Sequence, residues 1–313
     1  LYRGGNKMIW SLRILTADGK SYIENECVQF RIEKEAYTPY SRFEGIFVSS
    51  WRDLSNVSRV QFIYGVKTIH DGMGDSIEIY RQDHVTFLKV VSTSFSSMLC
   101  QNQTAPGMRT NLRFSDLSSE FASIPNVYFE STPRLNYIYI KEGSTMWDAA
   151  VNFSFRLNGT YPYVTSANLV RTTPAANNQI TVENRNIIKT GITYDRTKMI
   201  SDISMQDIEG NYNSYTLKNE NSALCNIIRK KQIPLDMQYL NDPQSALDYR
   251  IKFSMRSFKC TYAVYAGYLN EDLYDLMTIE NVVEQKRVHK IIITGNNAQV
   301  RTFVGTYEDG FLL

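Results

Sequence analysis

The stretch Val28-Gln-Phe-Arg-Ile-Glu33 alternates apolar and polar side chains one by one. Successive side chains of a β-strand point to opposite faces, so this pattern predicts a strand with one buried face. Residues 60–64, 77–80 and 85–91 predict further strands in the same way. Many short strands at this spacing are typical of a small barrel or sandwich.

Turn signals separate the expected strands. Asp18-Gly19 follows a strand-like segment that starts at Ser11, and an Asp-Gly pair in this position predicts a hairpin. The cluster Asp71-Gly-Met-Gly-Asp75 predicts another turn. Its Gly72-Met-Gly74 resembles a glycine-rich loop, but no helix follows, so we expect a hairpin turn and no phosphate site.

The middle of the chain mixes short helices and strands. We expect one or two helical turns in residues 96–102, a short helix in 115–121 and a strand in 135–140. A longer helix is expected after Ser144, a natural N-cap, and before Gly159. Two more strands are expected in residues 161–165 and 168–172.

The segment Thr173-Pro-Ala-Ala-Asn-Asn178 is the best candidate for a linker. Beyond it, Glu209-Gly-Asn211 predicts a hairpin, and residues 222–231 predict a helix that ends in the cations Arg229-Lys-Lys231. Asp242 is a natural N-cap for a helix with Pro243 at its first position. The segments 258–266, 289–294 and 300–307 predict strands.

Composition bounds the class of protein. The chain has 313 residues, a net charge of +2 and 43% hydrophobic residues, so it is long and apolar enough for about two globular domains. The near-neutral charge excludes a generally basic nucleic-acid binder. Aromatic residues are abundant, with 21 Tyr, 15 Phe and 3 Trp, as expected of half-buried sheets and of protein interfaces.

Four scattered cysteines, Cys27, Cys100, Cys225 and Cys260, contain no Cys-x-x-Cys pair and are expected to be free thiols. That usage favours assembly in a reducing compartment. No window holds 18 consecutive apolar residues, so no transmembrane helix is expected.

A search for catalytic or metal-binding motifs finds little. His70, His84 and His289 lie far apart in or beside expected strands, without the local pairing that metal sites use, and are expected at the surface or at strand edges. Ser144 is better explained as a helix cap than as a nucleophile.

Carboxylates and cations also have structural explanations. Glu24 with Glu26, and the cluster of Glu271, Asp272 and Asp275, are expected to be solvated, although a carboxylate pair for hydrolysis stays open. The basic runs 229–231 and 286–290 are short, and the stretch Tyr262-Ala-Val-Tyr-Ala-Gly-Tyr268 is expected to serve core and interface. The residues favour a structural or assembly protein, with no catalytic, cofactor-binding or metal-binding residue.

Three stretches carry a resemblance to a known family. They are Ser92-Thr-Ser-Phe-Ser-Ser-Met-Leu-Cys-Gln-Asn102 with Pro106, then Tyr139-Ile-Lys-Glu-Gly-Ser-Thr-Met-Trp-Asp148, and finally Tyr249-Arg250 with Gly267-Tyr268 and Ile293-Thr-Gly295. Together they resemble bacteriophage or prophage tail hub proteins of the late-control-D type, found in the baseplates of contractile tails. Gln101 stands where the family often has Asp.

The resemblance implies a mainly β chain with α+β parts, in which two tail-tube-like β-barrels flank a smaller α+β domain. The expected boundaries are a first barrel in residues 1–95, the α+β domain in 96–175, and a second barrel in 176–313 with a helical insertion at about 219–256. It further implies a structural protein without enzymatic activity. Three copies would form a ring that adapts the six-fold tail tube to the three-fold central spike.

The implied partners are two further copies of the chain, the tail tube protein, the central spike protein and other baseplate proteins. DNA would pass through the lumen without specific binding, and the chain would not insert into a membrane by itself. The implied location is the tail baseplate of a virion or phage-like particle, assembled in the bacterial cytoplasm. Two alternatives stay open: another tail component, such as a distal tail or tube-initiator protein, and a glycan-binding or glycan-cleaving β-protein.

Overall fold

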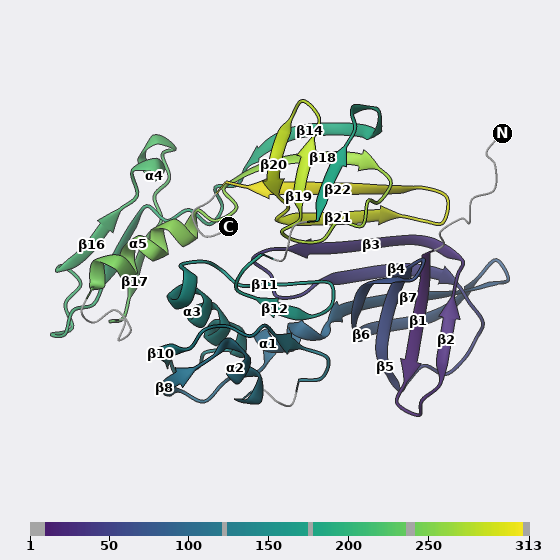
Figure 1. The fold of residues 1–313 in the computed structure, drawn as a ribbon, viewed down its shortest axis with the longest axis horizontal. Coiled ribbons are helices and arrows are strands. Elements are labelled where there is room, and N and C mark those ends of the chain that lie inside the picture. Colours follow the sequence, from purple (N-terminus) through teal and green to yellow (C-terminus); the bar gives the residue numbers. More distant parts are fainter. Residues whose placement is uncertain (1–9, 121–123, 175–177, 236–241, 309–313) are drawn as a thin grey trace.

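The computed structural model describes the chain except for residues 1–9, 121–123, 175–177, 236–241 and 309–313. The described part is mainly β, as expected, and strands from both halves of the chain meet in one large sheet (Figure 1). The expected linker 173–178 lies partly outside the described residues.

The large sheet has 11 strands and is antiparallel throughout. In spatial order they are β14 (Ile187–Tyr194), β18 (Lys259–Ala266), β22 (Val300–Tyr307), β21 (Lys290–Gly295), β3 (Cys27–Glu35), β4 (Arg42–Val48), β7 (Val85–Ser94), β6 (Lys67–Gln82), β5 (Val57–Tyr64), β1 (Trp10–Thr16) and β2 (Ser21–Glu24). Within the described residues the sheet is open, because β14 and β2 each pair with a single neighbour.

The centre of this sheet consists of two four-stranded units that meet where β3 pairs with β21. Outward from the junction, one unit runs β3-β4-β7-β6 and the other runs β21-β22-β18-β14. In each unit the two inner strands are consecutive in the chain, and an antiparallel pair follows them outward. The two sides differ farther out, because the N-terminal side continues through β5, β1 and β2 whereas the C-terminal side ends at β14.

Smaller sheets and helices flank the large sheet. The two-stranded sheet is β8 (Gly107–Leu112) with β10 (Leu135–Ile140). One three-stranded sheet contains β9 (Tyr128–Phe129), β11 (Tyr163–Val164) and β12 (Leu169–Arg171), and a second contains β13 (Gln179–Val182), β19 (Leu276–Ile279) and β20 (Val283–Arg287). The third contains β15 (Asp202–Met205), β16 (Tyr215–Lys218) and β17 (Lys230–Ile233). The α-helices are α1 (Met98–Gln101), α2 (Phe114–Glu120), α3 (Met146–Asn158), α4 (Glu220–Leu224) and α5 (Pro243–Ser254).

The main hydrophobic core lies under the large sheet and contains residues from both halves of the chain. Phe43, Phe47 and Phe62 pack together with ring centroids 4.6 to 6.4 Å apart, and Ile291 and Val304 extend the same core on the other side of the junction. Burying a side chain of this size stabilises the fold by roughly 1.5–3 kcal/mol. The two four-stranded units are therefore joined by packing as well as by the β3–β21 hydrogen bonds.

Two smaller cores support the helices. One places Trp147, Ala150 and Phe153 of α3 against the two-stranded sheet and its neighbours. The other packs Leu247 and Ile251 of α5 on the β15–β16–β17 sheet. This last sheet, with α4 and α5, forms a unit that projects from the body of the molecule, at the left of Figure 1, and we call residues 200–254 the projecting unit.

Several expected turns and caps differ in the structure. Asp71 to Asp75 forms no turn, because β6 continues through it with a register shift between Gly74 and Ser76, and the chain reverses instead at Asp83-His84, both with positive φ. Thr145, rather than Ser144, caps α3. The helix expected in 222–231 is wrong beyond Leu224, because the backbone turns at Asn226 with φ +55° and the cations Lys230 and Lys231 enter β17.

Other local expectations are confirmed. The Asp-Gly hairpin joins β1 and β2, the Glu209-Gly-Asn211 turn joins β15 and β16, and Asp242 caps α5 with Pro243 in its first turn. Gly159 ends α3 in the left-handed region with φ +71°. Val28 does not lie on the buried face of β3, where the alternation in residues 28–33 predicts it. A bulge after Cys27 leaves Val28 43% exposed and puts Cys27 in the core.

Candidate functional site

The open face of the large sheet carries a ladder of alternating charges across β21, β3 and β4. Strand alternation puts Phe30 and Ile32 in the core and leaves Arg31, Glu33 and Glu35 on the outer face. Lys290 of β21 lies 3.5 Å from Glu33 and 3.7 Å from Glu35. Opposite charges thus face each other across the junction of the two four-stranded units.

The ladder balances its own charge. Arg31 Nη2 lies 2.9 Å from Glu33 Oε2. Partial burial opposes ionisation of Glu33, but Arg31 and Lys290 prevail and hold its pKa below the usual range. A hollow of about 530 Å³ on this face includes Arg31, Glu44 and Lys89 in its lining. Such a face hydrogen-bonds to water and has little net attraction for a polyanion.

The two ends of the sheet present unpaired strand edges. On β14, the end strand beside β18, Ile188, Ile192 and Tyr194 are each 51–53% exposed. On β2, at the other end, Ile23 is 60% exposed. An open edge with exposed apolar side chains is a template for pairing with another chain. These edges are candidate contacts between subunits.

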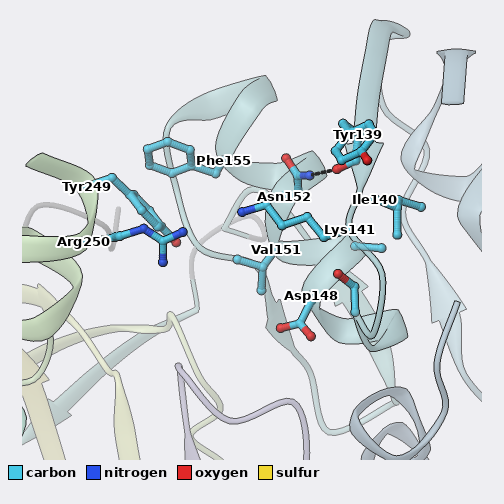
Figure 2. A pocket seen from close by; sticks show the side chains of 11 residues that line it. Tyr139, Ile140, Lys141, Asp148, Val151, Asn152, Phe155, Tyr249 and Arg250 are labelled. Atoms are coloured by element: carbon cyan, nitrogen blue, oxygen red, sulfur yellow. Dashed lines mark hydrogen bonds between the residues drawn. The ribbon is translucent and has the colours of Figure 1, made fainter. Parts of the chain in front are cut away.

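A groove separates α3 from α5, and two hollows of about 230 Å³ and 550 Å³ share Asp148, Val151, Tyr249 and Arg250 in their linings. Figure 2 shows the side chains of the smaller hollow, with Tyr249 and Arg250 of α5 facing Asp148, Val151 and Phe155 of α3. The rings of Phe155 and Tyr249 approach to 4.4 Å between centroids. This aromatic contact connects the projecting unit to the body of the molecule.

The floor of the groove is aromatic and its rim is basic. Phe253 stacks on Tyr249 and Tyr161, with centroids 5.7 and 5.5 Å apart, and the Arg256 guanidinium lies 3.8 Å from the centre of the Phe253 ring. Cationic side chains stack favourably on aromatic faces. The further cations in the linings are Lys141, Lys198, Lys231 and Arg250, and the one carboxylate is Asp148.

Sequence reasoning missed this groove because its walls come from segments about 100 residues apart. The available signals were the i, i+4 spacing of Tyr249 and Phe253 and the apolar stripe of α3. The resemblance did single out Tyr249 and Arg250, but it assigned them to the second barrel and to no site. The groove is created only when α3 and α5 are brought side by side.

Two of the three histidines lie in the core. His84 is exposed in the hairpin turn, as expected. His70 is fully buried between Ser41 Oγ and Ser92 Oγ, each 2.8 Å from a ring nitrogen. Burial and nearby Lys34 lower its pKa to about 3. His289 is also buried, and its Nδ1 accepts from the Tyr307 amide. The surface expectation was therefore wrong for His70 and His289.

Some of the carboxylates that were expected to be solvated are buried in the structure. Glu271 is fully buried, and its Oε2 accepts from the Leu269 amide at 2.7 Å. Burial raises the pKa of Glu271. Asp272 pairs with the buried Lys34. Glu24, also buried, accepts from Arg52 and Ser49, whereas Glu26 stays exposed and does not share its strand.

The basic runs and the tyrosine stretch have structural roles. Arg229 donates to backbone carbonyls of Arg196 and Met199, and Lys286 pairs with Glu308 at 2.9 Å. Tyr265 lies in the main core, as expected of the tyrosine stretch. The four cysteines are free thiols, as predicted.

Over the described ranges, no group of three His, Cys, Asp or Glu side chains is arranged to hold a metal ion. No helix in the described part of the chain is both long and apolar enough to cross a membrane.

Comparison with solved structures identifies the fold. A tail protein from Neisseria meningitidis MC58 superposes with a TM-score of 0.70 at 13% identity, covering 96% of this chain and 97% of that one. The 43 kDa tail protein of prophage MuSo2 from Shewanella oneidensis gives 0.65 at 9% identity, covering 95% and 97%. The chain therefore has the fold of phage tail proteins.

A third structure extends the likeness to secretion systems. An E. coli type VI secretion component, itself similar in structure to the T4 bacteriophage tail proteins gp27 and gp5, gives a TM-score of 0.57 at 8% identity, covering 96% of this chain and 76% of that one. No protein-family model matches the sequence. No curated protein matches it either.

Proposed function

We propose that the chain is a structural tail hub protein of a phage or phage-like contractile particle, of the late-control-D type. The observation that carries the proposal is the single antiparallel sheet to which both halves of the chain contribute strands, joined where β3 pairs with β21. A chain with two barrel-like units can occupy two of six positions in a ring with only three copies. That arrangement matches a six-fold tube on one side and a three-fold spike on the other.

Each unit is proposed as the wall of one tube-like barrel. The first barrel takes residues 1–95, the second takes 176–313 with the insertion at about 219–256, and the α+β domain of 96–175 lies between them in sequence. The exposed edge of β14, with Ile192 and Tyr194, would pair with the N-terminal barrel of the next copy. Three such contacts close the ring and remove its sheet edges from solvent.

The charge ladder suits the proposed lumen. Cations and carboxylates alternate across β21, β3 and β4, so DNA could pass without being held by a basic field. The proposed partners are the tube protein on one face of the ring and the spike and baseplate proteins on the other. Assembly is proposed to occur in the bacterial cytoplasm, and the protein is proposed to act without catalysis or a cofactor.

The test measures the mass of the full chain by sedimentation and images it by electron microscopy. We expect a three-fold ring with three times the mass of one chain. Ile192→Lys should abolish the three-fold ring, because it places a charge in each β14 contact, whereas Val66→Lys, at a fully exposed turn, should leave the ring intact. A chain that is monomeric at every concentration, or a ring insensitive to Ile192→Lys, overturns the proposal.

A further inference from the structure

The groove between α3 and α5 has more positive charge than its own residues neutralise. Within the described residues, Lys198, Lys231 and Arg256 form no ion pair within 4.0 Å. Asp148, the one carboxylate in the linings, accepts from both the amide and the hydroxyl of Thr145 at 2.8 Å and offsets only one positive charge. The groove is therefore electrostatically suited to an anionic occupant.

The same groove has room and surface for an apolar side chain. Its larger hollow of about 550 Å³ includes the partly exposed Ile200, Ile233 and Phe253 among its lining residues. Apolar area left open in this way gains from being covered. An occupant that carries acidic residues beside an aliphatic one would match both the rim and the floor.

One exposed segment of this chain has that chemistry. The turn between β15 and β16 contains Asp207-Ile208-Glu209, and Ile208 is 82% exposed between the two carboxylates. The turn is preorganised, because Asp207 Oδ1 accepts from the Glu209 and Asn211 amides at 3.0 and 2.8 Å and Asp207 Oδ2 accepts from Ser214 Oγ at 2.7 Å. Little conformational entropy would be lost when a partner binds it.

We propose that the groove receives the Asp207-Ile208-Glu209 turn of a second copy of the chain. Ile208 lies on the apolar floor, and the two carboxylates face Lys198 and Lys231. Ile208 of a given copy stays 82% exposed, so the turn does not fill the groove of its own chain. This contact is separate from pairing at β14, and it does not depend on the ring proposed above.

The test measures self-association of the full chain by sedimentation velocity in the Ile192→Lys background, so that loss of edge pairing does not obscure it. We expect association that weakens as salt rises. Ile208→Lys should raise the dissociation constant about tenfold or more. The matched control Ile228→Lys, 80% exposed in the same projecting unit, should leave the constant unchanged.

A charge exchange identifies the two surfaces. Glu209→Lys and Lys231→Glu should each weaken association, and the double variant should recover it, because the reversed charges again oppose each other. A chain that stays monomeric in the Ile192→Lys background overturns the proposal. Association that is unchanged by Ile208→Lys also overturns it. So does association that is weakened by Lys231→Glu and not restored in the double variant with Glu209→Lys, since the groove would then bind another segment.

Discussion

Lys34 of β3 forms an ion pair with Asp272 of the loop before β19, and Nζ lies 3.3 Å from Oδ1. The two residues are 238 positions apart in sequence. Ser166 joins them, because its hydroxyl accepts from Lys34 and its amide donates to Asp272 Oδ2 at 2.9 Å. One partly buried network therefore ties together the N-terminal strands, the middle segment and the C-terminal half.

Removing the cation of this network should be costly. Lys34→Met keeps an unbranched chain but leaves Asp272 without its cation, and the loss should be at most about 3 kcal/mol of unfolding free energy, below that of a fully buried pair, because the Asp272 side chain is 22% exposed. Urea unfolding measures the loss. Lys290→Met is the control, because its contacts with Glu33 and Glu35 are partly exposed and should contribute about 1 kcal/mol or less. Equal losses for the two variants would show that the network contributes little.

The network also predicts a response to acid. Burial opposes ionisation of Asp272, but Lys34 and Ser166 lower its folded pKa below 3.8, the value expected in the unfolded chain. The stabilisation is therefore present above pH 3.8 and is lost as the pH falls through the folded pKa. Lys34→Met should flatten this part of the stability profile, measured by urea unfolding at several pH values. An unchanged acid limb would mean that Asp272 does not control it.

His70 should make the protein less stable in mild acid. The pKa of His70 is about 3 in the folded chain and 6.5 in the unfolded chain. Below pH 6.5, His70 is therefore protonated in the unfolded chain but stays neutral in the folded chain. At pH 5 this costs about 2 kcal/mol relative to pH 7. His70→Gln can keep hydrogen bonds to Ser41 and Ser92, and it should remove this loss in unfolding measured between pH 7 and pH 5. A variant with the same loss as the natural chain would assign it to other groups.

The strand at Val28 to Glu33 shows which features of the fold a local sequence pattern predicts and which it does not. Alternation correctly predicts a strand with Phe30 and Ile32 inside, because side-chain direction is a local property. Continued by two residues, it also points Lys34 inward, yet no local pattern names Asp272 as its partner. The bulge that exposes Val28 depends likewise on the register with β4. Pairings between distant segments are set by tertiary packing, so they escape a local pattern.

The candidate sites divide in the same way. The core position of Tyr265 in the tyrosine stretch and the free cysteines are correctly predicted, because composition and spacing carry those signals. The groove requires α3 and α5 to lie together, and the charge ladder requires the β3–β21 register. Composition alone predicts a solvated Glu271, because a loop rich in acidic residues is normally exposed. In the structure the Glu271 side chain is instead fully buried.

Thr145, and not Ser144, should set the stability of α3. Thr145 Oγ1 accepts from the Asp148 amide at 3.1 Å, and Asp148 accepts in return from the Thr145 amide, which completes a capping box. Thr145→Ala should cost about 0.5–2 kcal/mol, and Ser144→Ala should change stability by less than about 0.5 kcal/mol. Thermal unfolding of both variants decides between the residues, and a larger loss for Ser144→Ala would contradict the cap seen in the structure.

Gly72 should tolerate no side chain, for a reason that no glycine motif suggests. A Cβ atom at this position of β6 would lie 2.0 Å from the carbonyl oxygen of Thr93 in β7, a backbone atom that cannot move without disturbing the sheet. Gly72→Ala should therefore cost about 1–3 kcal/mol or more, as overpacking does. At Gly74 the nearest atom is the Ile77 Cδ1 at 2.8 Å, the end of a flexible side chain, so Gly74→Ala should cost less. Urea unfolding of the pair tests the difference. A larger loss at Gly72 would confirm the close backbone approach to Thr93, whereas equal losses would mean that β6 resists alanine at both positions.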